Sequence, residues 1–117
     1  MKKGQDLLEI NQSLLSLSTR CYAFIDQIPP GYIITYKDLA QALGTRGYRA
    51  VGRIVGLNPN PPVTPCHRVV CSDGRLGGYS AKGGISEKIR LLAAEGIMVR
   101  DGWVIDFERV RWLWDSF

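Results

Sequence analysis

Apolar residues recur at a helical spacing through the first quarter of the chain. They are Leu7, Leu8, Leu14, Leu15, Leu17, Cys21, Phe24, Ile25 and Ile28, which fits a helix better than the alternation of a strand. We therefore predict a helical scaffold over residues 5–28, with Ser13 or Ser16 as its N-cap. Pro29-Pro30-Gly31 must end it, because a proline has no amide hydrogen and the residue before it avoids the helical region.

Two short helices with a glycine-bearing turn between them are predicted next. Thr35 is a favourable N-cap for residues 36–43, and Gly44 stands in the usual C-terminal position. The second helix covers about residues 48–57, with its valine and isoleucine side chains on one face. Such a pair over about residues 35–57 is either an ordinary helical hairpin or a helix-turn-helix, whose second helix enters a groove of DNA.

The composition of the second helix favours the DNA-binding alternative. Arg49 and Arg53 lie away from its apolar face. Gly52 and Gly56 each cost about 1 kcal/mol relative to alanine inside a helix, and Ala50 adds a third small side chain. Such losses are tolerated where another molecule must come close, and a nucleic-acid backbone would fit this description. We therefore expect the second helix to contact DNA.

Beyond this helix the chain alternates between stiff and glycine-rich segments. Asn58-Pro59-Asn60-Pro61-Pro62 forms a proline-rich connection. Residues 69–76 are predicted to form a β-hairpin with Asp73-Gly74 at its turn. The glycine-rich residues 77–84 carry the aromatic ring of Tyr79 and lack the spacing of a phosphate-binding fingerprint. This composition predicts a mobile lid with Tyr79 as its stacking surface.

The C-terminal third is predicted to contain a helix, a hairpin and a second helix. Ser86 is the expected cap of a helix over residues 86–95. Residues 97–117 are predicted to form an Asp-Gly hairpin and a last helix capped by Asp106, with the tryptophans as packing. Together the elements predict a mainly α fold with small β-hairpins, in one domain that covers residues 1–117.

Composition narrows the cellular setting and the class of partner. The net charge of +4 and the pI near 9.1 favour a polyanionic partner. No run approaches the ~20 apolar residues of a membrane span, and the start of the chain does not have the apolar core of a signal peptide. Three cysteines leave at least one thiol unpaired, which fits a reducing compartment. We expect an intracellular protein, cytoplasmic or nuclear, without contact to a membrane.

The chemistry of the chain is concentrated at Cys66-His67-Arg68, where a thiol, the only histidine and an arginine are consecutive. The thiolate is the reactive form, so a free cysteine of pKa about 8.5 needs positive charge or a base beside it. A lone cysteine or histidine is more often a buried structural residue. Three such residues after Pro65 favour a reactive site. A metal site is not expected, because no Cys-x-x-Cys pair is present and an extended backbone would turn Cys66 and His67 apart.

The same stretch carries a family resemblance. Pro65-Cys66-His67-Arg68-Val69-Val70 resembles the active-site signature of the O6-alkylguanine-DNA alkyltransferases, which transfer an alkyl group from a damaged guanine to their own cysteine. The pattern continues in Arg49-Ala50-Val51-Gly52, Asn58-Pro59, Gly78-Tyr79-Ser80 and Leu91-Leu92-Ala93-Ala94-Glu95-Gly96. The resemblance runs from about residue 28 to residue 97. It implies the winged helix-turn-helix-like C-terminal domain of that family.

The resemblance implies a catalytic set of four residues. Cys66 would accept the alkyl group, and His67 would reach the thiol through a water molecule. Glu95 would orient and charge the imidazole, and Asn58 would brace the hinge before the active-site segment, residues 58–71. Independently, Glu95 stands in the last turn of a predicted helix, where the dipole disfavours a carboxylate by about 0.3–1 kcal/mol. Departures of this kind cluster at functional sites.

The resemblance also implies how damaged DNA is held. Arg49 would enter the base stack in place of the flipped nucleotide, and Tyr36 would push on the neighbouring phosphate. Ala50, Gly52 and Arg53 would accompany them in the minor groove. The implied partner is double-stranded DNA that contains O6-alkylguanine, bound by a monomer.

The flipped base would be enclosed by the lid and the active-site strand. Tyr79, Ser80 and Val69 are the implied substrate contacts. No cofactor and no metal ion is implied. The lid is about two residues longer than the usual Tyr-Ser-Gly-Gly pattern, so the alkyl groups that fit are left open.

These observations predict a DNA-repair enzyme that acts once, a methylated-DNA–[protein]-cysteine S-methyltransferase. One alternative is an alkyltransferase-like protein, which binds O6-alkylguanine without transfer and hands it to another pathway such as nucleotide-excision repair. The short chain with its Asp-Gly tail hairpin resembles that group, but the group lacks the acceptor cysteine and this chain keeps Cys66. A second alternative is a helix-turn-helix regulator with a structural cysteine.

Overall fold

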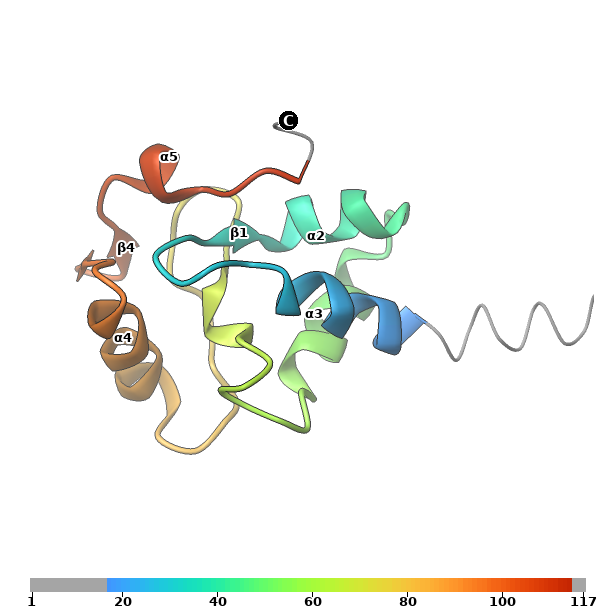
Figure 1. Cartoon of the computed structure of the whole chain (residues 1–117), viewed down its shortest axis with the longest axis horizontal. Helices are drawn as coiled ribbons and strands as arrows, with labels where there is room; N and C mark the ends of the chain where they lie inside the picture. The colour runs from blue at the N-terminus through green and yellow to red at the C-terminus, as the bar shows by residue number, and fades with distance from the viewer. Residues whose placement is uncertain (1–16, 115–117) are drawn as a thin grey trace, which may run out of the picture.

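The computed structural model describes residues 17–114, and it is mainly helical with two small sheets, as predicted (Figure 1). Residues 17–26 are helical. The elements that follow are β1 (Ile34–Thr35), α2 (Tyr36–Leu43), α3 (Tyr48–Gly56), the 3-10 helix η1 (Cys66–Arg68), β2 (Val69–Val70), α4 (Gly84–Ala94), β3 (Val99–Arg100), β4 (Trp103–Val104) and α5 (Phe107–Val110). No helix among the described residues is long and apolar enough to cross a membrane.

The first helix packs its apolar face into the core and ends before the two prolines. Cys21 and Ile25 are fully buried on that face. Tyr22 donates a hydrogen bond of 2.7 Å from its hydroxyl to the carbonyl of Ile54, which ties this helix to α3. The predicted start of the helix and its cap at Ser13 or Ser16 lie outside the described residues.

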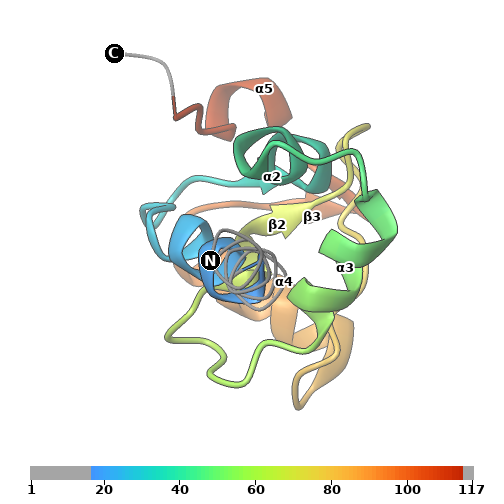
Figure 2. The ribbon, with the colours of Figure 1, turned by 90° about the vertical axis from the view of Figure 1, so that its right-hand side faces the viewer.

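The two helices α2 and α3 form as the sequence predicts, and Figure 2 shows the short turn that joins them. The Oγ1 of Thr35 accepts from the amide of Asp38 at 2.9 Å, and the Asp38 carboxylate accepts from the amide of Thr35 at 3.0 Å. This capping box fixes the start of α2. Gly44 ends it with φ = 74°, a conformation that favours glycine. The second helix ends at Gly56, one residue earlier than expected.

The predicted hairpin over residues 69–76 is wrong. Val69–Val70 forms β2, which pairs in parallel with β1, with Ile34 opposite Val69 and Thr35 opposite Val70. The Asp73-Gly74 segment still turns the chain, and the amide of Cys71 donates to the carbonyl of Arg75 at 2.9 Å. Both valines are fully buried, which is typical of a parallel strand covered on both faces, whereas a strand of a surface hairpin would alternate between buried and exposed positions.

The C-terminal segment covers the second edge of β1. The amide of Ile33 donates to Val110 at 2.9 Å, the amide of Trp112 donates to Ile33 at 2.8 Å, and Arg111 stands opposite Ile33 in a parallel bridge. Figure 1 shows this segment running from α5 back past β1 toward α2. The strand β1 therefore lies between β2 and the C-terminal segment.

The parallel pair also separates two buried clusters, because successive residues of a strand point to opposite faces. Ile34 and Val69 belong to a cluster with the first helix, α2, α3 and Cys66. Ile33 and Val70 belong to a cluster with α4 and the C-terminal elements. The reactive thiol is therefore part of the first cluster.

The C-terminal elements follow the prediction with three corrections. The last helix was expected to include Leu113 and Trp114, but α5 ends at Val110, because the next residues run alongside Ile33. The Asp-Gly hairpin forms as β3 and β4. The helix α4 begins at Gly84 without a side-chain cap, so Ser86 lies inside the helix and does not cap it. The reason is that Gly83 takes φ = 96°, which lets the chain enter the helix earlier. Asp106 precedes α5 but makes no capping hydrogen bond, and its carboxylate pairs with Arg109 at 3.2 Å.

Candidate active site and DNA-binding face

Cys66 lies at the start of a helical turn, so the backbone at Cys66 and His67 is not extended. Its amide donates to the carbonyl of Thr64 at 2.8 Å, and the amide of Arg68 donates to the carbonyl of Pro65 at 2.9 Å. The second of these bonds, with the bond from the amide of Val69 to the carbonyl of Cys66, forms the turn η1, which runs directly into β2. The thiol side chain is 6% exposed, so the sulfur is sheltered from bulk water.

His67 is held from behind by Glu95. The Nε2 of His67 and the Oε2 of Glu95 are 2.8 Å apart, and the imidazole is 2% exposed. Burial lowers the pKa of His67, and Arg68 and Lys88 lower it further, against the opposite effect of Glu95. The imidazole is therefore neutral near pH 7, and the expectation that Glu95 charges it is wrong because burial outweighs the carboxylate. An ionised carboxylate only accepts hydrogen bonds, so the proton of His67 sits on Nε2.

The other nitrogen of this ring is unusual among the described side chains. The Nδ1 of His67 is buried and has no hydrogen-bond partner within residues 17–114. With the proton on Nε2, Nδ1 carries a lone pair and can accept a proton. The ring therefore offers a base on one side while Glu95 fixes it on the other.

Arg68 is placed differently from the sequence expectation. It was expected to supply positive charge beside the thiol, but its Nε and Nη2 each donate to the Glu95 carboxylate at 2.8 Å. Its Nη1 donates to the carbonyl of Ile28 at 2.7 Å. Burial alone would raise the pKa of Glu95, but the bonds from Arg68, His67 and the Gly31 amide outweigh it and lower that pKa. This explains how a carboxylate is stable at the negative end of α4.

Lys88 holds the surroundings of the thiol together, although nothing in the sequence marked it as a site residue. This lysine is fully buried, and its Nζ donates to the carbonyls of Val69 at 2.8 Å, Leu76 at 2.7 Å and Gly78 at 3.0 Å. Burial lowers its pKa to about 8. It thus ties α4 to the strand after the reactive turn and to the start of the lid. The sequence held one sign that Lys88 is buried: it stands four residues before Leu92 and so lies on the apolar face of the helix.

A cavity of about 200 Å³ opens at the thiol, and α2, α3, η1 and the lid all contribute to its wall. It is lined by Tyr36, Gly52, Val55, Gly56, Cys66, Gly78, Tyr79 and Ser80. A Cβ atom on Gly52 would meet nothing within 4 Å, so the glycine leaves open space in front of α3. The Ser80 hydroxyl donates to the carbonyl of Gly56, which holds the lid against the end of α3.

The cavity brings together only part of the predicted set. Tyr36, Gly52, Tyr79 and Ser80 line it together with Cys66. The arginines expected to hold DNA, together with the small residue between them, are on the exposed or open side of α3; these are Arg49, Ala50 and Arg53. Neither arginine makes an ion pair within the described part of the chain.

Two predicted residues act on the backbone around the site. The side-chain amide of Asn58 donates to the carbonyl of Thr64 at 2.7 Å, and its oxygen accepts from the amide of Asn60 at 3.0 Å. These bonds hold the proline-rich loop that precedes Cys66. Val69, which was expected to contact the substrate, is fully buried in the core; its amide donates to the carbonyl of Cys66 and its carbonyl accepts from Lys88.

The lid faces the proline-rich loop across a second cavity. This space of about 400 Å³ is lined by Pro61, Pro62, Tyr79, Ala81, Lys82, Gly83 and Glu87. Tyr79 belongs to both cavities. Ala81, Lys82 and Gly83 of the lid therefore border the space beside the thiol cavity.

The three thiols are in different surroundings. Cys21 is fully buried, and burial raises its pKa to about 11. Cys66 opens into the cavity, and Cys71 is partly exposed. Within residues 17–114, no three histidine, cysteine, aspartate or glutamate side chains are placed to hold a metal ion. The chemistry that this arrangement supports is nucleophilic attack by a thiol with a base behind it.

Comparisons with known proteins agree with this geometry. The Pyrobaculum aerophilum methylated-DNA–protein-cysteine methyltransferase is 51% identical over 74 residues, which are 63% of this chain and 48% of that protein. The bifunctional methyltransferase/endonuclease of Thermoplasma volcanium is 38% identical over 106 residues, 90% of this chain and 33% of that protein. This chain therefore spans between a third and a half of the length of these two relatives.

A solved structure of a similar protein agrees with these comparisons of sequence. The Mycobacterium tuberculosis protein OGT, in complex with DNA, superposes with a TM-score of 0.63 at 38% identity, and the match covers 67% of this chain and 48% of that chain. The family model of the 6-O-methylguanine DNA methyltransferase DNA-binding domain matches residues 16–97, which hold the cavity, the thiol and the ion pairs behind it. The chain belongs to the 6-O-methylguanine DNA methyltransferase family.

Proposed function

We propose that this protein repairs DNA by moving an alkyl group from O6 of guanine to Cys66, once per molecule. The observation that carries the proposal is the thiol at a cavity with a neutral, oriented imidazole next to it in the chain. The names of the curated relatives support transfer over recognition alone, because they are cysteine methyltransferases. A retained thiol also has no role in a protein that only binds the base.

The proton of the thiol leaves through His67. Its Nδ1 is the free acceptor, and a water molecule between Nδ1 and the sulfur would carry the proton. The imidazolium that forms is stabilised by Glu95, which Arg68 keeps ionised. This is the arrangement of a nucleophile, a base and a group that holds the base.

Transfer then requires no further reagent. The sulfur of Cys66 forms a bond to the alkyl carbon, and the bond between that carbon and O6 breaks with its electron pair moving onto the guanine. The proton held by His67 passes back through water to the guanine. The products are an S-alkylcysteine and unmodified guanine, so no cofactor or metal is needed. The thioether has no route back to a thiolate.

The substrate has to leave the duplex to reach the thiol. A base inside a helix is stacked and paired, and the sulfur is enclosed by α2, α3 and the lid. The exposed Arg49 and Arg53 flank the open face of Gly52, which suits α3 to a narrow groove and Arg49 to the space left by the flipped base. Tyr36 would act on the neighbouring phosphate, and Tyr79 and Ser80 would cover the guanine. We propose a monomer in the minor groove.

The direct test is a mass measurement. After incubation with a duplex that contains O6-methylguanine, the protein should gain one methyl group, located on Cys66 by peptide mapping, and the DNA should regain guanine. The yield should stop at one lesion per protein. Cys21 and Cys71 in the same digest serve as controls and should stay unmodified.

Two results would contradict the proposal. Tight binding of the lesion with no mass change after prolonged incubation would assign the protein to lesion recognition without transfer. Sustained multiple turnover would exclude a stoichiometric thioether. The variant Cys66→Ser should still bind the lesion, because the residues proposed to flip and cover the base remain.

A further inference from the structure

An arginine near the C-terminal end of the described chain makes an ion pair with the helix that carries Tyr36. The Nη2 of Arg111 lies 2.6 Å from the Oδ1 of Asp38, and its Nε lies 3.0 Å from the Oδ2, across 73 residues of sequence. Two parallel N–H···O bonds of this kind fix orientation as well as distance. Arg111 lies outside the residues that match the family model, 16–97.

Asp38 also forms the capping box at the start of α2. Its carboxylate also accepts from the amide of Thr35, and its own amide donates to the Thr35 hydroxyl. The carboxylate side chain is only 7% exposed. Tyr36 is the first residue of α2 and lies inside this closed set of bonds. The ion pair therefore fixes the turn on which the Tyr36 ring is mounted.

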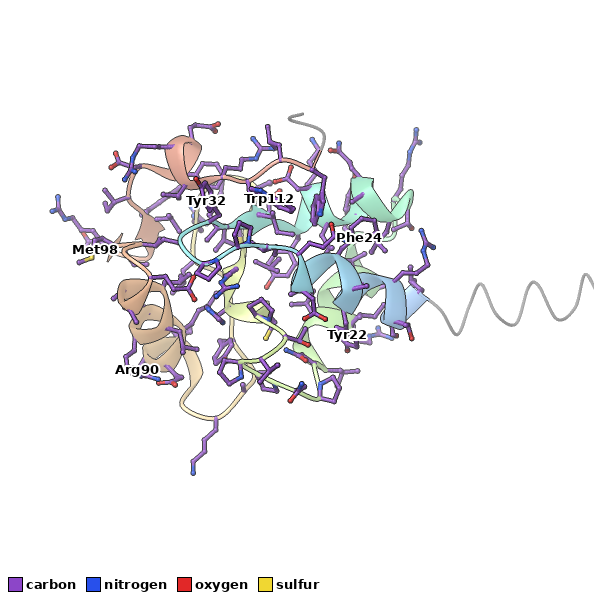
Figure 3. The ribbon with its side chains drawn as sticks, in the orientation of Figure 1. Tyr22, Phe24, Tyr32, Arg90, Met98 and Trp112 are labelled. Atoms are coloured by element: carbon purple, nitrogen blue, oxygen red, sulfur yellow. The ribbon has the colours of Figure 1, made fainter. Side chains whose placement is uncertain are left out.

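The backbone of the residues around Arg111 also holds β1 in place. The bonds from Ile33 to Val110 and from Trp112 to Ile33 align the C-terminal segment with β1. Trp114 lies edge-on to both Trp112 and Phe24, at centroid distances of 5.1 and 5.2 Å. Figure 3 shows Trp112 close to α2, on the part of the molecule that carries Phe24. The segment is thus packed as well as hydrogen-bonded.

Tyr36 joins this brace to the proposed reaction. Its ring lines the cavity at Cys66 and also a neighbouring cavity of about 380 Å³ with Lys37, Tyr48 and Cys71. The opposite edge of β1 pairs with β2, which follows the reactive turn directly. The Arg111 brace and the thiol are therefore connected through one short strand.

We propose that Arg111 is a positioning residue for transfer from DNA, because it holds the start of α2 and so keeps Tyr36 at the rim of the thiol cavity. The inference rests on the proposed function. A base delivered from a duplex needs Tyr36 against its phosphate, whereas a free base has no phosphate and enters the cavity alone. Loss of Arg111 should therefore affect the two substrates differently.

The test compares these two substrates in single-turnover experiments. With Arg111→Ala, transfer from a duplex that contains O6-methylguanine should slow by about tenfold to a hundredfold, the usual effect of a small misplacement. The reaction with the free base O6-benzylguanine should keep its rate. Arg109→Ala is the matched control, since Arg109 lies in the same segment and pairs with the exposed Asp106. It should leave both rates unchanged.

Further variants separate positioning from charge. Arg111→Lys keeps the charge but loses the two-pronged contact, so it should restore only part of the duplex rate. Asp38→Asn should show the same preference for the free base. The double variant Asp38→Asn/Arg111→Ala should be no slower than the slower single variant, because both changes break one interaction.

Equal losses on the duplex and the free base, or no loss on either, would overturn the proposal. If Arg111→Ala does not fold, the same two outcomes are read from Arg111→Lys. If the unmodified protein transfers an alkyl group from neither substrate, the proposed function is wrong. The positioning role of Arg111 is then tested by measuring the affinity for the lesion duplex. Arg111→Ala should then weaken binding to the lesion duplex, and an unchanged affinity would refute the positioning role.

Discussion

The Glu95 carboxylate receives four hydrogen bonds, from Nε2 of His67, Nε and Nη2 of Arg68, and the amide of Gly31. Because Arg68 shares this carboxylate, Glu95 can orient the imidazole without charging it. Burial then decides the protonation of His67, and its pKa lies below the usual value. One acidic residue thus keeps its neighbour available as a base.

The pH dependence of the transfer rate should show the protonation of His67. His67 accepts a proton only when it is neutral, so the rate should fall on the acid side, with a midpoint below the usual histidine pKa of about 6.5. In Arg68→Ala, one group that lowers the pKa of His67 is lost and Glu95 acts on the imidazole alone. The acid limb should therefore move to higher pH. Single-turnover rates between pH 5 and 8 measure it, and an unmoved limb in Arg68→Ala would contradict the account.

Thiol reactivity offers a test that needs no DNA. His67→Ala or Glu95→Gln should slow the alkylation of Cys66 by iodoacetamide at neutral pH, because the base or its orientation is lost. Mass spectrometry of the three cysteine peptides gives each rate. Cys21 should be the slowest, since burial raises its pKa to about 11. Equal reactivity of all three thiols, unchanged in both variants, would refute the relay.

At the scale of elements, Lys88 links α4 to β2 and to the lid. Lys88→Met would leave the carbonyls of Val69, Leu76 and Gly78 without their donor. We expect the free energy of unfolding to fall by about 2–4 kcal/mol, as for the loss of hydrogen bonds to a buried charged group. Urea denaturation measures this change. Arg90→Met is the matched control, because Figure 3 shows Arg90 on the outer side of α4, and it should have little effect.

The same variant has a pH signature. Burial lowers the pKa of Lys88 to about 8, while in the unfolded chain it is about 10.4. Between these values the unfolded state binds more protons, so stability gains from rising pH. The unmodified protein should therefore gain stability relative to Lys88→Met from about pH 8 to pH 10. A constant difference across this window would mean that burial does not lower the pKa of Lys88 in the folded protein.

Elements with local signals were predictable from the sequence, and elements that depend on distant partners were not. The start of α2 follows from Thr35 and Asp38, and its end from Gly44, all within the helix and its caps. The partner of β2 could not be read, because two buried valines look the same in a hairpin and in a parallel pair. The start of α4 was misplaced because the glycine at position 83 enters the helix without a polar cap.

Some residues of the candidate site could likewise be predicted from the sequence, and others could not. Residue types and order were enough to indicate Cys66, His67 and Glu95, which the structure brings together in part through a 2.8 Å contact. The sequence could not show that Arg68 reaches Glu95, because the two are separated by 27 residues. Lys88 was missed because a lysine in a helix is expected to be exposed to solvent, and the sequence does not show the carbonyls that surround this one.

At the scale of the whole molecule, a net charge of +4 and the exposed arginines of α3 predict binding that weakens with salt. No asparagine or glutamine lies on α3 to read base edges, so binding should depend little on the surrounding sequence. Titrations of undamaged duplexes at several salt concentrations measure both properties. A strong preference for one undamaged sequence would contradict this view.

Arg49 should distinguish damaged from undamaged DNA. Its proposed place in the stack exists only when a base is flipped, so Arg49→Ala should weaken binding to a lesion duplex more than binding to its undamaged counterpart. Arg100→Ala, an exposed arginine on β3, is the matched control for loss of one positive charge. Competition between the two duplexes measures the effect. An equal loss on both would reduce Arg49 to a phosphate contact.

The position of β1 between β2 and the C-terminal segment sets an order of assembly during synthesis. A nascent chain that has emerged as far as Gly96 already exposes the thiol, the imidazole and the carboxylate, and the α2–α3 hairpin can form from local contacts. One edge of β1 is still open at that point, because its partner at Arg111 has not yet been made. We therefore expect the turn that carries Cys66 to gain its final support only after the C-terminal segment has been synthesised.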